Sequence, residues 1–150
     1  MNITLVPPEE VMFAWNRARA HLEPAIERCK GRWTMEHLCA AVATGRSQLW
    51  LAFDDNSRVY GALTTEITNY PAKKMLSMHF IGGTDFDEWY GDLLKMITSY
   101  ARDCGCDGLE GVARFGFWKW LEKNFRCRVP SEGGEHALIA CLCDMSPNPL

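Results

Sequence analysis

A strand, a long helix and a second strand follow one another in the middle of the sequence. The first strand covers Met75–Ile81, and the helix after it carries apolar residues at helical spacing between Trp89 and Tyr100. The second strand covers Leu109–Ala113. Two strands that flank such a helix can be joined only by a crossover, which places them parallel to each other. The sequence therefore predicts a mixed sheet with helices packed on both faces.

The residues before this unit supply a short strand and two helices. Ile3–Val6 is β-prone, and a helix is expected from the residues after it until Pro24 ends it, with a further turn or short helix over Ala25–Cys29. A second helix is expected to begin after Thr34, which serves as its N-cap, and to stop at Gly45.

The remaining elements are further strands and one more helix. Two strands joined as a hairpin are expected at Leu49–Phe53 and Arg58–Thr68. Beyond residue 113 the pattern predicts the helix Phe115–Lys123, the strand Phe125–Val129, the turn Ser131–Glu135 and the strand Ala137–Cys143. Residues 144–150 are expected to form a flexible tail.

Composition fits one compact domain over residues 1–150. The chain is 47% hydrophobic and 23% charged, which is enough apolar surface to offset the entropy of ordering. A net charge of −3 supplies no broad basic field for nucleic acid, and no apolar run approaches the roughly 20 residues of a membrane helix. The first residues lack the basic region of a signal peptide, so neither secretion nor a membrane partner is expected.

The cysteines do not form a metal motif. Seven cysteines in a chain with no export signal are expected to be reduced thiols. Cys104-x-Cys106 and Cys141-x-Cys143 have the wrong spacing for a zinc knuckle, and two cysteines at alternate positions of a strand simply share a face. No metal site is expected.

The order of the elements is similar to the fold of the GCN5-related N-acetyltransferases (GNATs), in which the strands before and after the long helix splay apart and acetyl-CoA lies in the gap. Leu121–Phe125, followed by Arg126, resembles the GNAT signature near the end of the fold, with leucine in place of tyrosine and without its glycine. Further motifs resemble a GNAT-like family of tailed bacteriophages, with T7-like podophage relatives described as virion or morphogenesis proteins. These are Thr65-Glu66-Ile67, Tyr70-Pro71, Gly82-Gly83 with Trp89 six residues later, segment 101–106 and segment 111–120.

The resemblance implies an α/β (α+β) fold with a mixed, mainly antiparallel sheet of six to seven strands, helices on both faces and a central, splayed parallel pair. It implies one of two functions. The first is an acyl-CoA-dependent N-acetyltransferase that acts on an unknown small or protein amine. The second is a non-catalytic phage protein of the host cytoplasm or the virion, which acts in particle assembly or binds a host factor.

The cofactor residues follow from the same resemblance. The pantetheine arm of acetyl-CoA would run along the end of the strand Met75–Ile81 and pair with the backbone of Phe80 and Ile81, while Gly82, Gly83 and Thr84 would lie at the phosphates. Active GNATs hold the pyrophosphate with an Arg/Gln-x-x-Gly-x-Gly/Ala loop whose backbone amides face the anion.

Segment 81–88 has two glycines but no arginine, and it brings three carboxylates to the place of the pyrophosphate: Asp85, Asp87 and Glu88. Two interpretations remain open. Asp85 as N-cap with Glu88 three residues later forms a capping box at the start of the helix. Alternatively, the segment is a modified cofactor loop.

An N-acetyltransferase also needs a base to remove a proton from the substrate ammonium. Glu66, His79 and Glu110 are the alternative candidates, and each is also consistent with a purely structural role. Strand alternation places His79 on the face opposite to Phe80, toward the cleft. No tyrosine follows Lys123, where many GNATs carry the general acid.

An aromatic segment is the best candidate for a protein contact. On a helix Trp118 and Trp120 lie about 200° apart, so one narrow stripe does not bury both. Together with Phe117 they are expected to bind a protein partner or a second copy of the chain, the alternative being burial of both under a loop.

Overall fold

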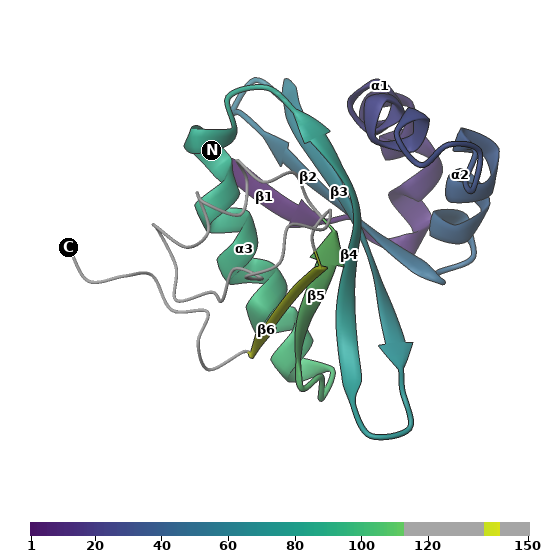
Figure 1. Ribbon diagram of the computed structural model, residues 1–150. Helices are drawn as coiled ribbons and strands as arrows, with labels where there is room; N and C mark the ends of the chain where they lie inside the picture. Colours follow the sequence, from purple (N-terminus) through teal and green to yellow (C-terminus); the bar gives the residue numbers. More distant parts are fainter. Residues whose placement is uncertain (113–136, 142–150) are drawn as a thin grey trace. The chain divides into compact units, whose positions relative to one another are not determined.

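The computed structural model describes residues 1–112 and 137–141 (Figure 1). The predicted helix Phe115–Lys123, the strand Phe125–Val129, the turn Ser131–Glu135 and the tail 144–150 lie outside the described residues, as do Phe117, Trp118 and Trp120. The elements are β1 (Asn2–Leu5), η1 (Pro8–Glu10), α1 (Val11–Glu27), α2 (Met35–Ala43), β2 (Ser47–Phe53), β3 (Val59–Asn69), β4 (Lys74–Gly83), α3 (Phe86–Asp103), β5 (Gly108–Val112) and β6 (Ala137–Cys141).

The sheet has six described strands in the order β1-β2-β3-β4-β5-β6. β1 and β2, β2 and β3, and β5 and β6 are antiparallel pairs, whereas β4 and β5 are parallel. The predicted mixed sheet with a parallel crossover is therefore confirmed. The parallel ladder joins Met75–Met78 to Gly108–Gly111, and β4 then continues over residues 79–83.

The described residues divide into two compact units. The first unit comprises Met1–Glu66 and His79–Leu94, and the second comprises Ile67–Met78 with the residues from Lys95 onward. Within residues 1–112 and 137–141, no helix combines the length and apolarity needed to cross a bilayer.

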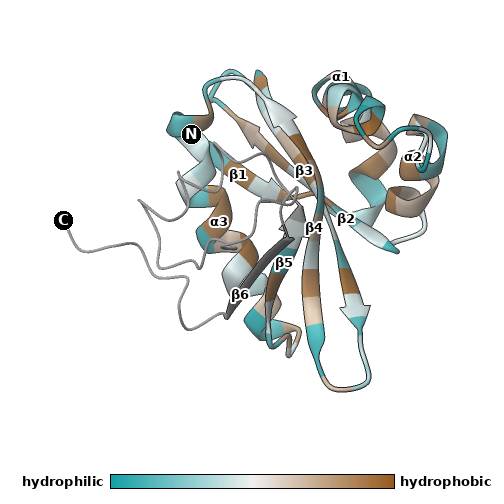
Figure 2. Cartoon of the chain, viewed as in Figure 1, coloured by the Kyte–Doolittle hydropathy of each residue, from teal (hydrophilic) through white to brown (hydrophobic). Residues whose placement is uncertain are grey.

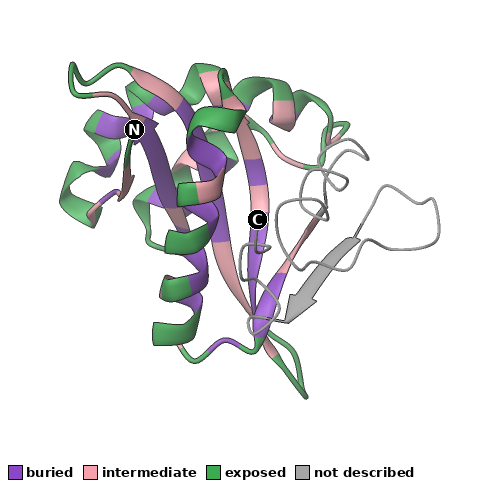
Figure 3. Cartoon of the chain, turned by 90° about the vertical axis from the view of Figure 1, so that its left-hand side faces the viewer, coloured by how far each residue is buried: buried purple, intermediate pink, exposed green. Residues whose placement is uncertain are grey.

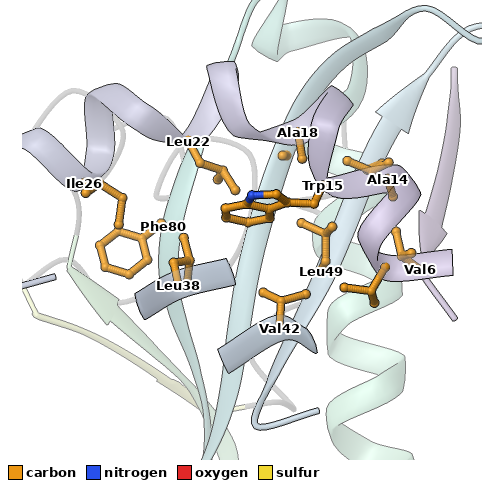
Figure 4. Packing of buried hydrophobic residues seen from close by; sticks show 13 residues of the cluster. Val6, Ala14, Trp15, Ala18, Leu22, Ile26, Leu38, Val42, Leu49 and Phe80 are labelled. Carbon is orange, nitrogen blue, oxygen red and sulfur yellow. The ribbon is translucent and has the colours of Figure 1, made fainter. Parts of the chain in front are cut away.

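In the first unit, α1 and α2 pack on β2 and β3 through a buried cluster that includes Trp15, Leu22, Leu38 and Leu49 (Figure 4). Figure 2 shows apolar residues along these strands and polar residues on the outer sides of the two helices. Figure 3 shows buried residues along the strands and exposed residues on the side of the front helix that faces the viewer. The cluster explains how two helices of modest length are held against the sheet, since each apolar side chain removed from water contributes roughly 1.5–3 kcal/mol.

Helix α1 does not end at Pro24, and no separate helix begins at Ala25. The helix continues to Glu27 with Pro24 in its interior, so both expectations were wrong. Leu22 and Ile26 are buried and lie one turn apart on the side that packs on the sheet. The free energy gained by burying the apolar side chains of this last turn exceeds the free energy of the one backbone hydrogen bond that proline removes.

Helix α2 begins and ends as the sequence indicates. The Thr34 hydroxyl oxygen accepts a hydrogen bond from the backbone N–H of His37 at 3.1 Å, which confirms Thr34 as the N-cap. Gly45 follows the helix with a φ of 82°, in the left-handed region that favours glycine.

The other face of the first unit is covered by the start of α3. Trp89 is 1% exposed and lies against Gly61 of β3, where any side chain on residue 61 would overlap the indole. The indole Nε1 donates to the carbonyl oxygen of Thr84 at 2.7 Å, which fixes the turn that leads into the helix.

In the second unit, the rest of α3 packs its apolar side on β4 and β5, and Leu76, Ile97, Ala101 and Leu109 are fully buried. Asp107 connects the end of the helix to β4. Its carboxylate accepts from the N–H of Lys74 at 2.9 Å and its own N–H donates to the Lys74 carbonyl at 2.7 Å. These two hydrogen bonds hold the residue before β5 against the first residue of β4, where the parallel pairing of the two strands begins.

Candidate functional site

Glu66 on β3 is the centre of a small polar cluster in the first unit. Its Oε1 pairs with Nε of Arg46 at 2.6 Å, and its Oε2 lies 3.5 Å from Nε2 of His79 on β4. The side chains of Glu66 and His79 are 16% and 24% exposed, whereas that of Arg46 is 64% exposed. Two of the three candidate bases are therefore side by side, with Arg46 holding the oxygen that faces away from His79.

Aromatic side chains lie beside the pair of Glu66 and His79. The Trp33 ring lies 5.9 Å from the His79 ring and 5.6 Å from the Phe80 ring, and the Arg46 guanidinium is 5.8 Å from the Trp33 ring. Phe80 itself is buried near Ile26 and Leu38 (Figure 4). The cluster of Glu66, His79, Trp33 and Arg46 thus combines a carboxylate, an imidazole and an apolar surface.

His79 and Phe80 do not point to opposite faces of β4, as strand alternation predicted. Their ring centroids are 5.9 Å apart and both rings contact Trp33, so the two side chains lie on the same side of the strand. A regularly pleated strand would send successive side chains to opposite faces. This local departure from alternation brings His79 to Glu66.

Glu110, the third candidate base, belongs to the second unit. Its Oε1 accepts hydrogen bonds from the hydroxyls of Tyr70 and Ser77, each at 2.7 Å. The bond to Glu110 raises the pKa of Tyr70, because the carboxylate favours the protonated phenol. Glu110 is thus part of a separate cluster.

The two glycines of the expected phosphate loop contact the protein itself. A side chain on Gly82 would overlap the carbonyl oxygen of His21 in α1, and one on Gly83 would overlap the carbonyl oxygen of Tyr60 in β3. Gly83 also has a φ of 148°. The N–H of Thr84 donates to the Tyr60 carbonyl at 2.8 Å. Close packing of backbone on backbone therefore accounts for both glycines.

The start of α3 follows the capping interpretation only in part. Phe86 is the first helical residue, which puts Asp85 at the N-cap position. Asp85 has a φ of 55°, however, in place of the extended backbone of a capping-box residue, and the bond from the N–H of Glu88 is received by the Asp85 backbone carbonyl at 2.9 Å. The expected capping-box geometry was wrong, although the acidic first turn of Asp87 and Glu88 is present.

Sequence reasoning missed Trp33, Arg46, Tyr70 and Ser77 as partners of the candidate bases. Ser47 lies opposite Glu66 in the ladder of β2 and β3, so the pairing of the two predicted strands would have placed Arg46 near Glu66. No comparable signal points to Trp33, which reaches His79 from the segment before α2. Within the described ranges no group of three or more metal-binding side chains is present.

Comparisons with known proteins identify the fold. No protein-family profile and no curated protein matches the chain. Among solved structures, aminoglycoside 6′-acetyltransferase type Ii superposes with a TM-score of 0.65 at 12% identity, over 99% of this chain and 100% of that one. Tetrahymena GCN5 gives 0.58 at 12% identity, over 95% of this chain and 96% of that one.

A third similar structure holds a ligand. The PaiA N-acetyltransferase of Thermoplasma acidophilum, solved in complex with coenzyme A, gives a TM-score of 0.59 at 12% identity and covers 92% of this chain and 96% of that one. These similarities span nearly the whole length of each protein and agree with the strand order, the parallel β4 and β5 pair and the helices described above. The chain therefore has the GNAT fold.

Proposed function

We propose that this protein is an acyl-CoA-dependent N-acyltransferase in which Glu66 and His79 remove the proton from the amine. The observation that supports this most is the contact between Glu66 Oε2 and His79 Nε2, placed by β3 and β4 inside a GNAT fold. A GNAT-fold relative of known structure binds coenzyme A. The bacteriophage origin suggested by the sequence motifs remains part of the proposal.

The chemistry that the cluster offers is general base catalysis. An amine attacks a carbonyl carbon only after the ammonium has lost a proton, and a carboxylate beside an imidazole forms a pair that can take up that proton. Arg46 holds Oε1 of Glu66, so Oε2 is the carboxylate oxygen that faces the imidazole Nε2 and shares a proton with it. Acyl-CoA, when bound, supplies the acyl group as a thioester, and the C–N bond forms as the C–S bond breaks.

The end of β4 and the segment after it fit the pantetheine arm of acyl-CoA better than its pyrophosphate. Residues 79–83 of β4 continue beyond the ladder with β5, so the backbone of Phe80 and Ile81 offers amide groups for pairing with pantetheine. The segment after them offers less to a pyrophosphate. Its glycines are used in internal packing, Thr84 N–H is bonded to Tyr60, and the next residues are acidic.

The poor fit of this segment to a pyrophosphate favours an alternative function. In the alternative, the protein is a non-catalytic GNAT-fold protein that acts in phage assembly or binds a host factor. Three carboxylates near a pyrophosphate are unfavourable by an amount on the order of 1 kcal/mol each. In that case the segment of Phe117, Trp118 and Trp120 is the proposed contact surface. Trp118→Ala and Trp120→Ala would weaken association in sedimentation experiments without lowering the thermal stability of the protein.

Calorimetric titration with acetyl-CoA, followed by an assay of free thiol release with a panel of primary amines, tests the proposal. We expect micromolar binding and turnover that falls by roughly 100-fold or more in Glu66→Gln. His79→Gln should lower turnover less, with acetyl-CoA affinity unchanged in both variants. Glu27→Gln, which removes a carboxylate from the exposed end of α1, is the matched control.

The outcomes separate the two functions. Absence of acetyl-CoA binding at millimolar concentration contradicts the acyltransferase proposal and favours the alternative. Binding together with undiminished turnover in Glu66→Gln would instead show that acyl transfer does not use this base.

A further inference from the structure

The connection between α1 and α2 carries a local excess of positive charge. Residues 28–46 contain four basic residues and one acidic residue, whereas the other 131 residues contain 12 basic and 18 acidic residues. Three of the four basic residues, Arg28, Lys30 and Arg32, follow one another at alternate positions, and all three are exposed. This basic turn, defined by Arg28, Lys30 and Arg32, is therefore a positive surface on a protein whose remaining residues are mainly acidic.

Hydrogen bonds give the basic turn a fixed shape. The N–H of Arg32 donates to the Cys29 carbonyl oxygen at 3.3 Å, and Nε of Arg32 donates to the same oxygen at 2.9 Å. The Cys29 thiol donates to the carbonyl oxygen of Ile26 at 2.8 Å, and Cys29 packs against the buried cluster of the first unit. Because the turn is ordered before a ligand arrives, binding on it costs little conformational entropy.

Lys30 occupies a position that the backbone conformation of the turn does not favour for lysine. The two central residues of the turn, Lys30 and Gly31, have φ values of 54° and 82°. Asparagine followed by glycine is the pair that suits two successive positive φ values, because the short asparagine side chain tolerates the left-handed region. A departure from such a local preference is expected where the side chain has a function. The position therefore indicates a use for the lysine charge.

The surface continues from the basic turn to Trp33 and Arg46. Trp33 follows Arg32 in the chain, and the Arg46 guanidinium lies 5.8 Å from the Trp33 ring. Arg46 also pairs with Glu66, so it adds less positive charge than the three residues of the basic turn. Trp33 is half-buried. The positive surface thus ends beside an apolar ring.

The size and surroundings of this surface fit a short acidic segment of a protein better than a nucleic acid. A long polyanion would extend beyond the basic turn and meet negative charge, beginning with Glu27 and Glu36, which are exposed on either side of it. The Trp33 ring already packs on His79 and Phe80, which leaves less of it for stacking with a base. A short peptide with a few carboxylates needs no extended positive field.

We propose that the basic turn, with Trp33 at its edge, binds an acidic peptide segment of a partner protein. Arg28 and Arg32 supply planar guanidinium groups, which suit carboxylates, and Lys30 supplies a point charge at the tip of the turn. The surface does not depend on acyl transfer. It applies equally to the acyltransferase and to the non-catalytic alternative.

Fluorescence anisotropy of a dye-labelled peptide of alternating glutamate and glycine, titrated with the full chain, tests the surface. The same peptide with glutamine in place of glutamate is the uncharged probe, and a single-stranded oligothymidylate of similar length is the nucleic acid probe. We expect the glutamate peptide to bind at least about tenfold more tightly than the glutamine peptide. Added salt should weaken this binding, because the charges involved are exposed.

Variants of Lys30 separate a role in binding from a role in folding. Lys30→Glu should lower the affinity for the glutamate peptide about tenfold, since it replaces an attraction with a repulsion. Lys30→Asn should lower that affinity about threefold without lowering the thermal stability, because asparagine suits the positive φ of residue 30. The control is Lys95→Glu, which makes the same change of charge at an exposed position of α3 and should leave the affinity unchanged.

Equal affinity of Lys30→Glu, Lys30→Asn and the unaltered protein for the glutamate peptide would overturn the inference, as would no peptide binding at millimolar concentration. Tighter binding of the oligothymidylate than of the glutamate peptide, with loss in Lys30→Glu, would also overturn it in favour of a nucleic acid. Titration of the same variants with acetyl-CoA keeps this result apart from the proposed function. Failure of acetyl-CoA to bind rejects only the acyltransferase, whereas failure of the peptide to bind rejects only this surface.

Discussion

The rings of Trp33 and His79 lie 5.9 Å apart at an interplanar angle of 58°, and Nε2 of the same imidazole lies 3.5 Å from Oε2 of Glu66. Trp33 comes from the segment before α2 and His79 from β4, so a residue of the connection between two helices supports a candidate catalytic group. The position of His79 therefore depends on packing between elements as well as on its own strand.

Replacement of Trp33 should disturb both stability and the Glu66–His79 pair. Trp33→Ala removes the ring that packs on His79 and Phe80, and we expect a loss of about 2 kcal/mol in the free energy of unfolding, measured by urea denaturation. Trp33→Phe should restore most of it. If Trp33→Ala left the His79 ring resonances unchanged, the ring would not be what positions the imidazole.

Gly82 is expected to be required for folding. Gly82→Ala places a methyl group on the His21 carbonyl oxygen, so α1 or β4 must move, and the free energy of unfolding should fall by about 2 kcal/mol or more. Gly45→Ala is the control, since no atom lies within 4 Å of the added carbon and only its φ of 82° opposes the change, at about 1 kcal/mol. Comparable losses in the two variants would argue against a steric role for Gly82.

Charge removal at the start of α3 should tighten cofactor binding. Asp85 and Glu88 are exposed and lie where the resemblance places the pyrophosphate, so Asp85→Asn and Glu88→Gln each remove a repulsion of ~1 kcal/mol, or about fivefold in the dissociation constant for acetyl-CoA. Asparagine also tolerates the φ of 55° at residue 85. Unchanged affinity in calorimetry at low salt would place the phosphates elsewhere.

Tyr100 should titrate well above the ordinary pKa of a tyrosine. Burial, together with a hydrogen bond to Cys104, raises the pKa of Tyr100 to about 12 from an ordinary value of 10.0. A raised pKa of an acid means that the folded state favours the neutral phenol. Its contribution to stability is complete below pH 10.0 and is lost as the pH rises through about 12.

Spectrophotometric titration of tyrosinate checks this prediction. Tyr100→Phe should remove a step near pH 12. Loss of a step near pH 10.0 in that variant would show that the Tyr100 phenol is not withdrawn from water.

Within residues 1–112, the order of the strands and main helices and the parallel pairing of β4 with β5 were determined by the sequence alone. Both depend on local patterns: the change of apolar period along the chain, the Thr34 cap, the turn at Gly45 and the crossover that a helix between two strands imposes. These signals lie within short segments, so they can be interpreted without knowing which residues pack against each segment.

The composition of the candidate site was decided only by the tertiary structure. Helix α1 passes through Pro24 because the sheet buries Ile26, and His79 meets Glu66 because β4 departs from regular alternation beside Trp33. Gly82 and Gly83 are explained by the backbones of α1 and β3. Each outcome is set by contacts between residues distant in sequence, whose energies exceed the local preferences that a sequence pattern reports.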